Sequence, residues 1–288
     1  MKVAIIHILL VQSSLALVQV WDNVVSSSSR TPLHQAATDA GLNHQVLDRQ
    51  KQAKSMVGHA LDSILTQLND PIRYVEYWCR QEWRHIEAHA DVDELLARTQ
   101  PQDEFRFPQH GHVLYLQIGA QVQGPTCVFP QVSLGGDLLV EATDHQDLVV
   151  VPAVAGRLLR FPGTALHAVP RPHNLWTLPF VQGAAQYTPE YERSVILFNT
   201  WPDQPPLDVP LERAVGEAVL CLGQSEWQAQ KIADGPSLTG TTRAKVWLLG
   251  DYKRRNHKFR TVNLNAPDDI DDILGEQHQV QRVLVSPQ

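Results

Sequence analysis

A histidine and an aspartate two positions apart are the first residues of this chain whose types and spacing could do chemistry. His89 and Asp91 lie in the segment HIEAHADVDE, residues 85–94. On an extended strand, alternate side chains point to the same side, so both residues could bind one metal ion. On a helix, residues two apart do not face each other. The pair therefore predicts a metal site only if residues 89–91 are extended.

His167 is a candidate for the third ligand. It lies in GRLLRFPGTALHAVPRP, residues 156–172, after an apolar run and a tight turn. Two histidines and one carboxylate are the ligand set of non-haem Fe(II) oxygenases, which leaves coordination positions open for a bidentate 2-oxo acid and dioxygen. A 2-oxo acid with a second carboxylate also needs a cation in the pocket. Arg193 heads the apolar run RSVILFNTW and could bind that carboxylate with two hydrogen bonds.

The segment around His89 also allows other interpretations. His85 and His89 are spaced like two zinc ligands on one helix, but Glu87 stands one position later than the catalytic glutamate of zinc proteases. Asp93 could replace Asp91 as a ligand, although it also suits a helix cap. The sequence HGH at 110–112 has the same alternate spacing as a metal pair, and we interpret it as a polar turn before a strand.

The secondary structure predicted around these residues changes along the chain from helix to short strands. Residues 33–68 have a helical pattern, which Asp70-Pro71 ends. Short apolar runs separated by glycine and proline follow, at 113–118, 126–129, 137–142, 148–153, 156–161 and 193–201. Many short strands of this kind favour a sandwich or barrel over βαβ units. We therefore predict a mainly β fold with flanking helices.

The order of these motifs resembles the 2-oxoglutarate- and Fe(II)-dependent dioxygenase superfamily, in its prolyl 4-hydroxylase-like branch. The similarity lies in HAD (89–91), VLYLQI (113–118), GRLLRFPGTALHAVPRP and RSVILFNTW, and covers residues 72–202. It implies a double-stranded β-helix (a jelly roll, cupin-like) with helices on one face. It also implies a hydroxylase that couples oxidative decarboxylation of 2-oxoglutarate to C–H hydroxylation of an unidentified substrate, with prolyl or other peptidyl groups as the first candidates.

The resemblance also implies roles for particular residues. The residues that would ligate Fe(II) are His89, Asp91 and His167. Arg193 would bind the far carboxylate of the cosubstrate 2-oxoglutarate, and Tyr115 would add a hydrogen bond to it. Tyr77 or Trp78 would line the cosubstrate pocket. Dioxygen is the second cosubstrate, and ascorbate is a candidate cofactor. Two alternatives stay open: a cupin-like metal-binding module without oxygenase activity, and a zinc-dependent hydrolase.

Parts of the chain depart from the family pattern. The interval from His167 to Arg193 is wider than the family's compact spacing, and we interpret residues 171–192 as a proline-rich loop. Residues 203–288 form an extension with no counterpart in the resemblance. The extension contains a helix-like stretch at 212–222, an apolar strand-like stretch at 245–250 and a basic run at 253–260. We predict one oxygenase domain over residues 32–288.

Charge and the N-terminal segment limit the partners and the location. The net charge of −7 gives no reason to expect nucleic acid binding, and the three cysteines suit neither a zinc site nor a disulfide framework. Residues 1–31 are interpreted as a signal-peptide-like segment followed by a polar linker, VVSSSSRTP. The apolar run is too interrupted for a stable membrane span. A cleaved signal would direct the protein to the secretory pathway or endoplasmic reticulum; otherwise we expect it in the cytoplasm.

Overall fold

The computed structural model describes residues 18–82, 86–101, 104–119, 125–133, 146–169, 192–213, 226–239, 242–246, 262–266 and 279–286. The first elements are β1 (Gln19–Asp22), α1 (Ser27–Ala40), β2 (Gln45–Asp48) and α2 (Met56–Gln67). The central elements are β3 (Tyr74–Glu82), β4 (Ile86–His89), α3 (Glu94–Ala97), β5 (His110–Ile118), β6 (Thr126–Ser133), β7 (Gln146–Val151), β8 (Leu158–Pro162), β9 (Ala165–Val169) and β10 (Glu192–Trp201). The last elements are β11 (Gln228–Ala229), β12 (Ala233–Thr239), β13 (Thr242–Val246), β14 (Val262–Ala266) and β15 (Gln281–Ser286).

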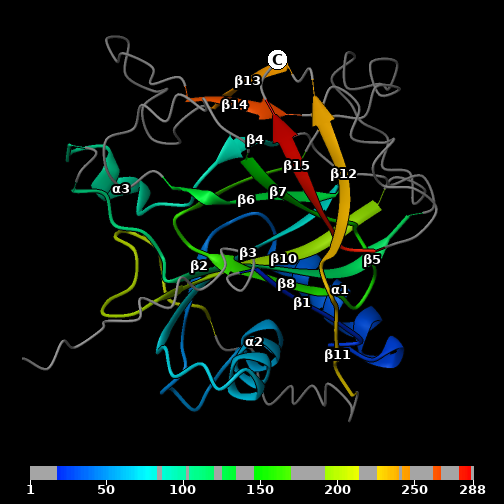
Figure 1. Ribbon diagram of the computed structural model, residues 1–288. Coiled ribbons are helices and arrows are strands. Elements are labelled where there is room, and N and C mark those ends of the chain that lie inside the picture. The colour runs from blue at the N-terminus through cyan, green and yellow to red at the C-terminus, as the bar shows by residue number, and fades with distance from the viewer. Residues whose placement is uncertain are drawn as a thin grey trace, which may run out of the picture.

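Strands β3 to β10 form two facing sheets, and successive strands lie in opposite sheets except β6 and β7, which are neighbours in the same sheet (Figure 1). The major sheet contains the order β8-β5-β10-β3, and the minor sheet contains β7-β6-β9-β4. Every pairing inside these two groups is antiparallel. Eight strands interleaved in this way make a double-sheet jelly roll. The fold is a double-stranded β-helix. The fold class predicted from the sequence is confirmed.

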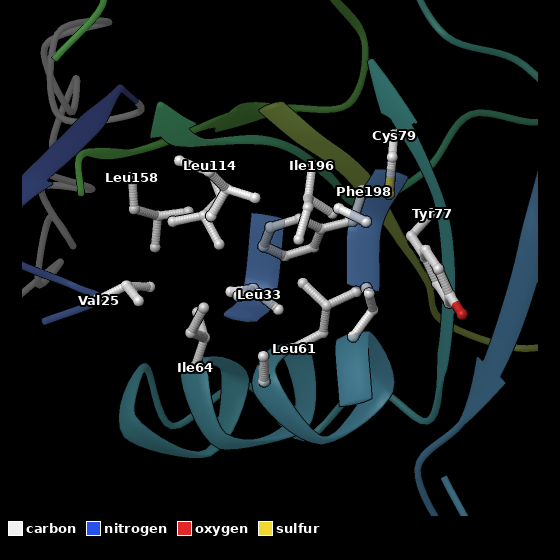
Figure 2. Packing of buried hydrophobic residues seen from close by; sticks show 14 of the residues in the cluster. Val25, Leu33, Leu61, Ile64, Tyr77, Cys79, Leu114, Leu158, Ile196 and Phe198 are labelled. Carbon is white, nitrogen blue, oxygen red and sulfur yellow. The ribbon is translucent and has the colours of Figure 1, made fainter. Parts of the chain in front are cut away.

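The major sheet is buried on both faces, because helices cover the face that points away from the jelly-roll interior. Leu61 and Ile64 of α2, together with Leu33 of α1, pack against Leu114 and Ile196 of the sheet (Figure 2). Residues in alternate positions, such as Val113 and Val195, belong to a second cluster between the two sheets. Burial on both faces explains why the sequence of these strands is almost continuously apolar.

The predicted linker at residues 24–32 is wrong, since α1 begins at Ser27. The side chain of Ser26 caps the helix by accepting from the backbone N–H of Ser29. Leu33 and Ala37, four positions apart, are fully buried against the major sheet, and this packing outweighs the low helix propensity of the serines. Before the helix, β1 pairs with β8, so ordered structure starts ahead of the predicted domain start. Residues 1–17, which carry most of the signal-like segment, lie outside the described residues.

The helical pattern of residues 33–68 is in fact interrupted. Gly41, with φ of 71°, ends α1 in the left-handed region that glycine favours, and β2 then adds to the edge of the major sheet beside β3. Helix α2 follows and ends at Gln67, before Asp70-Pro71 as predicted. Among the described residues, no helix is long and apolar enough to cross a membrane.

The C-terminal extension adds strands to both sheets. Strand β11 pairs with β1 at the edge of the major sheet, while β15 pairs with β7 and β12 pairs in parallel with β15. Strands β13 and β14 form a separate pair. The apolar stretch predicted at 245–250 overlaps β13 only at Lys245 and Val246. The stretches at 137–142, 171–191, 214–222 and 253–260 lie outside the described residues.

The interpretation of HGH as a polar turn is also wrong, because these residues begin β5. His112 is only 2% exposed and stacks on Phe198, with ring centroids 4.3 Å apart. It lies opposite Arg160 in the β5–β8 register, on the helix side of the sheet. Arg160 donates to Asp70, which is 5% exposed, so this arginine is paired in a largely buried position and not at the surface. The two histidines therefore lie outside the jelly-roll interior.

These buried histidines should make the fold sensitive to acid. Burial lowers the pKa of His110 to about 4, and burial together with Arg160 lowers the pKa of His112 well below its ordinary value. In the unfolded chain both titrate near pH 6.5. Below that pH the unfolded state binds more protons than the folded state, so the stability present above pH 6.5 is lost as the pH falls toward 4.

The substitution His112→Phe should make the slope of unfolding free energy against pH shallower by up to about 1.4 kcal/mol per pH unit. Urea unfolding at several pH values between 7 and 5 would measure this slope. The slope of the same quantity between pH 8 and pH 9 is the control. An unchanged slope would contradict it.

Candidate functional site

His89, Asp91 and His167 meet where the end of β4 lies beside the middle of β9. In the β4–β9 register His89 lies directly opposite His167, and their ring centroids are 4.3 Å apart. The two carboxylate oxygens of Asp91 lie 3.7 Å from His89 Nε2 and 3.9 Å from His167 Nε2. One ligand atom from each of the three residues lies within 4.8 Å of the others. Residues 86–89 are strand, and residues 90–93 belong to no helix, as the metal interpretation requires.

The protonation states of this cluster suit a divalent metal. Burial, followed by the charge of His89, lowers the pKa of His167 to about 4, so its imidazole is neutral at pH 7. Its Nδ1 lies 3.3 Å from the carbonyl oxygen of Ala165, which leaves Nε2 on the side of Asp91. Burial alone would raise the pKa of Asp91, but the two histidines and a hydrogen bond from Asn199 bring it below its ordinary value. Neutral imidazole and carboxylate are the forms that bind metal.

Asn199 holds Asp91 in place, and the sequence analysis missed it. Its Nδ2 donates to Asp91 Oδ2 at 3.1 Å, and the asparagine itself is 2% exposed. It lies on the inner face of β10, because Val195 and Leu197, in alternate positions of the same strand, pack in the cluster between the sheets. The sequence contained a signal for Asn199. In the apolar run RSVILFNTW it stands an even number of positions after Arg193, so both side chains point to the same face of the strand.

An aromatic ring covers the cluster on the major-sheet side. The ring of Phe161 lies 4.7 Å from that of His167. Phe161 faces Gly111 across the β5–β8 ladder, and a Cβ at Gly111 would come within 2.6 Å of the phenyl ring. Glycine at this position therefore lets the ring lie flat against β5 and exclude water from the histidine.

A second polar group lies deeper between the sheets. Arg193, 3% exposed, donates from Nη2 to Thr126 Oγ1 at 3.0 Å, and the hydroxyl of Tyr115 lies 2.6 Å from the same oxygen. The guanidinium carbon is 5.2 Å from the Tyr115 ring centroid. Burial lowers the pKa of Arg193, while Tyr115 opposes the shift. The structure thus brings the two predicted cosubstrate residues together and adds Thr126, which the sequence analysis missed.

The register fixes how far this group lies from the histidines. Val128 pairs with His167 across the β6–β9 ladder, and Thr126 lies two residues further along β6 on the same face. Two residues of strand span about 7 Å. The Arg193–Thr126–Tyr115 group and the His–Asp cluster therefore both face the interior between the two sheets, at positions about 7 Å apart along β6.

The assignment of Tyr77 to the cosubstrate pocket is wrong, because this residue points to the opposite face of β3. Tyr77 packs in the helix-side cluster (Figure 2). Its hydroxyl donates to the carboxylate of Glu212 at 2.8 Å. Strand alternation places its neighbour Trp78 on the inner face, opposite Leu197 of β10. Trp78, the other candidate at this position, is therefore the residue that faces the interior.

The competing ligand candidate Asp93 has structural partners. It accepts from the backbone N–H of Leu96 as the N-cap of α3 and pairs with Arg106, so it is a cap and not a member of the metal cluster. His85 lies outside the described residues.

Comparison with known proteins finds similarity at the level of structure. No protein-family model matches the chain, and no curated protein sequence matches it. A prolyl-4-hydroxylase from Pseudomonas putida is 16% identical, over 65% of this chain and 87% of that chain, with a TM-score of 0.38. HygX from Streptomyces hygroscopicus, with nickel, 2-oxoglutarate and hygromycin B bound, is 14% identical over 65% and 83%, with a TM-score of 0.39.

A third similar structure is SnoN, described as a non-heme alpha ketoglutarate dependent epimerase from nogalamycin biosynthesis. It is 12% identical over 64% of this chain and 78% of that chain, with a TM-score of 0.37. The fold assignment itself follows from the strand order of this chain.

Loss of the Asn199 side chain should weaken metal binding. In the variant Asn199→Ala, Asp91 loses the donor that orients it, so we expect the affinity for Co(II) or Fe(II) to fall about tenfold. Anaerobic metal titration with dialysis would measure this. The control is Asn43→Ala, which removes the same side chain from a cavity outside the jelly roll. Equal affinities of both variants would show that Asn199 does not support the cluster.

Proposed function

We propose that this protein is an Fe(II)- and 2-oxoglutarate-dependent oxygenase that hydroxylates a C–H bond of its substrate. The observation that carries the proposal is the joint presence, between the same two sheets, of two histidines with one carboxylate and of a buried arginine beside two hydroxyl groups. The first group suits Fe(II), and the second suits a distal carboxylate. A cupin-like module that only binds metal has no need of the second group.

His89, Asp91 and His167 would hold the iron. Three protein ligands leave positions open for a bidentate 2-oxo acid and dioxygen. When bound, these groups supply the oxidising chemistry, in which decarboxylation of 2-oxoglutarate to succinate accompanies hydroxylation. The protein residues orient them: Ala165 fixes the ring of His167, and Asn199 fixes the carboxylate of Asp91.

Arg193 would bind the far carboxylate of 2-oxoglutarate. Arg193 is almost fully buried and donates to Thr126, and a guanidinium fork can bind a carboxylate through two hydrogen bonds. The separation of about 7 Å along β6 suits a five-carbon chain that reaches from the iron to the arginine. Tyr115 would add a hydroxyl donor to the same carboxylate, at the position predicted from the sequence.

Apolar side chains around these polar groups would keep water out. Val113, Leu159 and Val195 of the major sheet face Val128 and Val149 of the minor sheet. Exclusion of water strengthens the electrostatic interactions in the pocket and protects reactive groups from side reactions. A prolyl or peptidyl substrate and a role for ascorbate stay predictions from the sequence resemblance.

An anaerobic titration tests the function directly. Addition of 2-oxoglutarate to the Fe(II)-loaded protein should give a weak visible charge-transfer band, and oxygen should then yield succinate and carbon dioxide. The band requires both ligand groups, so His167→Ala should abolish it. A protein that binds iron without the band or succinate would be a metal-binding module. Activity with zinc and no 2-oxoglutarate would indicate a hydrolase.

Arg193 can be tested separately from the metal. Arg193→Ala should raise the dissociation constant for 2-oxoglutarate at least tenfold, because it removes a charge-assisted hydrogen bond, and should leave Fe(II) binding near the wild-type level. The control is Arg282→Ala, which removes a guanidinium paired with Asp147 on β7. Loss of iron in Arg193→Ala with unchanged 2-oxoglutarate affinity would refute this role.

A further inference from the structure

Strand β10 is irregular at the residues around Arg193. On the side of β5, its register is regular from Val195 to Thr200 and shifts between Ser194 and Val195. On the side of β3, the register shifts between Glu192 and Val195. Such irregularities bend a strand and re-aim its side chains, because the ladder no longer fixes each residue. The ladders therefore set the direction of the Arg193 side chain less firmly than the directions of the residues that follow it.

A histidine on helix α1 contacts the residues on both sides of Arg193. His34 Nδ1 lies 2.8 Å from Ser194 Oγ, and its Nε2 lies 3.3 Å from Glu192 Oε1. The side-chain amide of Gln117 faces the same carboxylate, with its nitrogen 3.1 Å from Oε2 in the orientation that lets it donate. One imidazole therefore connects the helix to positions 192 and 194, while position 193 points to the opposite face of the sheet.

These contacts are largely shielded from solvent. Ser194 has no exposed surface, and the side chains of His34 and Glu192 are 18% and 11% exposed. Loss of one partner of a buried hydrogen bond leaves the other without compensation, which a surface contact would recover from water. Leu33, the residue before His34, is fully buried against the major sheet. The packing of α1 therefore holds the imidazole in place.

A serine, a histidine and a glutamate in contact are also the groups of a nucleophilic hydrolase site. That chemistry needs a serine hydroxyl that the substrate can reach. Ser194 faces α1 and has no exposed surface. The three groups therefore suit a role in holding the backbone of β10 and do not suit nucleophilic attack.

We propose that His34 is a positioning residue for Arg193. By holding residues 192 and 194 from the helix side, it sets the direction in which the Arg193 guanidinium enters the space between the sheets, where it donates to Thr126. This inference rests on the proposed function for the identity of the ligand, 2-oxoglutarate. The effect of His34 on the arginine itself can be tested without any ligand.

The Nε–H signal of Arg193 in the full-length ¹⁵N-labelled protein tests this effect in the absence of ligand. It is the arginine side-chain signal that Arg193→Lys removes. His34→Ala should shift it, because the residues on both sides of the arginine lose their contact with α1. In a Ser194→Ala background the same change should have a smaller effect, since residues that act through one contact are not additive. An Arg193 signal that stays at its wild-type position in His34→Ala would overturn the proposal.

Anaerobic binding titrations separate positioning from a general loss of structure. His34→Ala should raise the dissociation constant for 2-oxoglutarate about fivefold and leave that for Fe(II) near the wild-type value. His34→Asn should recover most of the 2-oxoglutarate affinity, because its amide can reach Ser194 from the place of Nδ1. The matched control is His59→Ala, which removes an imidazole from α2, the other covering helix, and should bind both ligands like the wild type.

The outcomes for the two ligands have different meanings. Equal losses of 2-oxoglutarate and Fe(II) affinity in His34→Ala would show that this residue only stabilises the fold, and an unchanged 2-oxoglutarate affinity would also refute positioning. A wild-type protein that binds Fe(II) and no 2-oxoglutarate would refute the proposed function. In that case the Arg193 signal alone decides whether His34 orients the arginine.

Discussion

Burial of strand β10 on both faces is the constraint on which the site depends. One face of this strand packs Ile196 and Phe198 under the helices, and the other presents Arg193 and Asn199 to the interior. Its neighbours β3 and β5 hold it on both sides through ladders of hydrogen bonds. Alternate residues of a strand point to opposite faces. Packing of one set against the helices therefore fixes which polar side chains point into the jelly-roll interior.

Polar groups inside such a strand are tolerated only when they have partners. The interior groups of β10 each have one across the sandwich: Arg193 donates to Thr126 of β6, and Asn199 donates to Asp91 beyond β4. These two hydrogen bonds connect the two sheets at two positions along β10. An apolar residue at either position would pack well and be easier to bury, so the polar choice is better explained by ligand binding than by stability.

The sequence predicted the parts of the site that rest on residue type and order. His89, Asp91, His167, Arg193 and Tyr115 all come together in the interior, and the jelly roll is as expected. Thr126 and Asn199 were missed because their roles depend on which strands face each other, which local spacing does not reveal. Tyr77 was misplaced by one residue, and in a strand a shift of one residue exchanges the faces. The serine-rich start of α1 and the start of β5 were misjudged because tertiary packing outweighed the polar composition.

The surroundings of Arg193 differ from those of the stacked rings of His44 and Trp78. Hydroxyl groups and apolar side chains surround Arg193, which would suit the carboxylate of the proposed cosubstrate. The stacked rings of His44 and Trp78 lie next to carboxylates, and the His44 side chain is 38% exposed. His44 belongs to the segment before β2, outside the eight strands of the jelly roll, and β2 adds to the sheet only through β3. Substitutions in this added segment should therefore leave undisturbed the strands that carry the candidate metal ligands and Arg193.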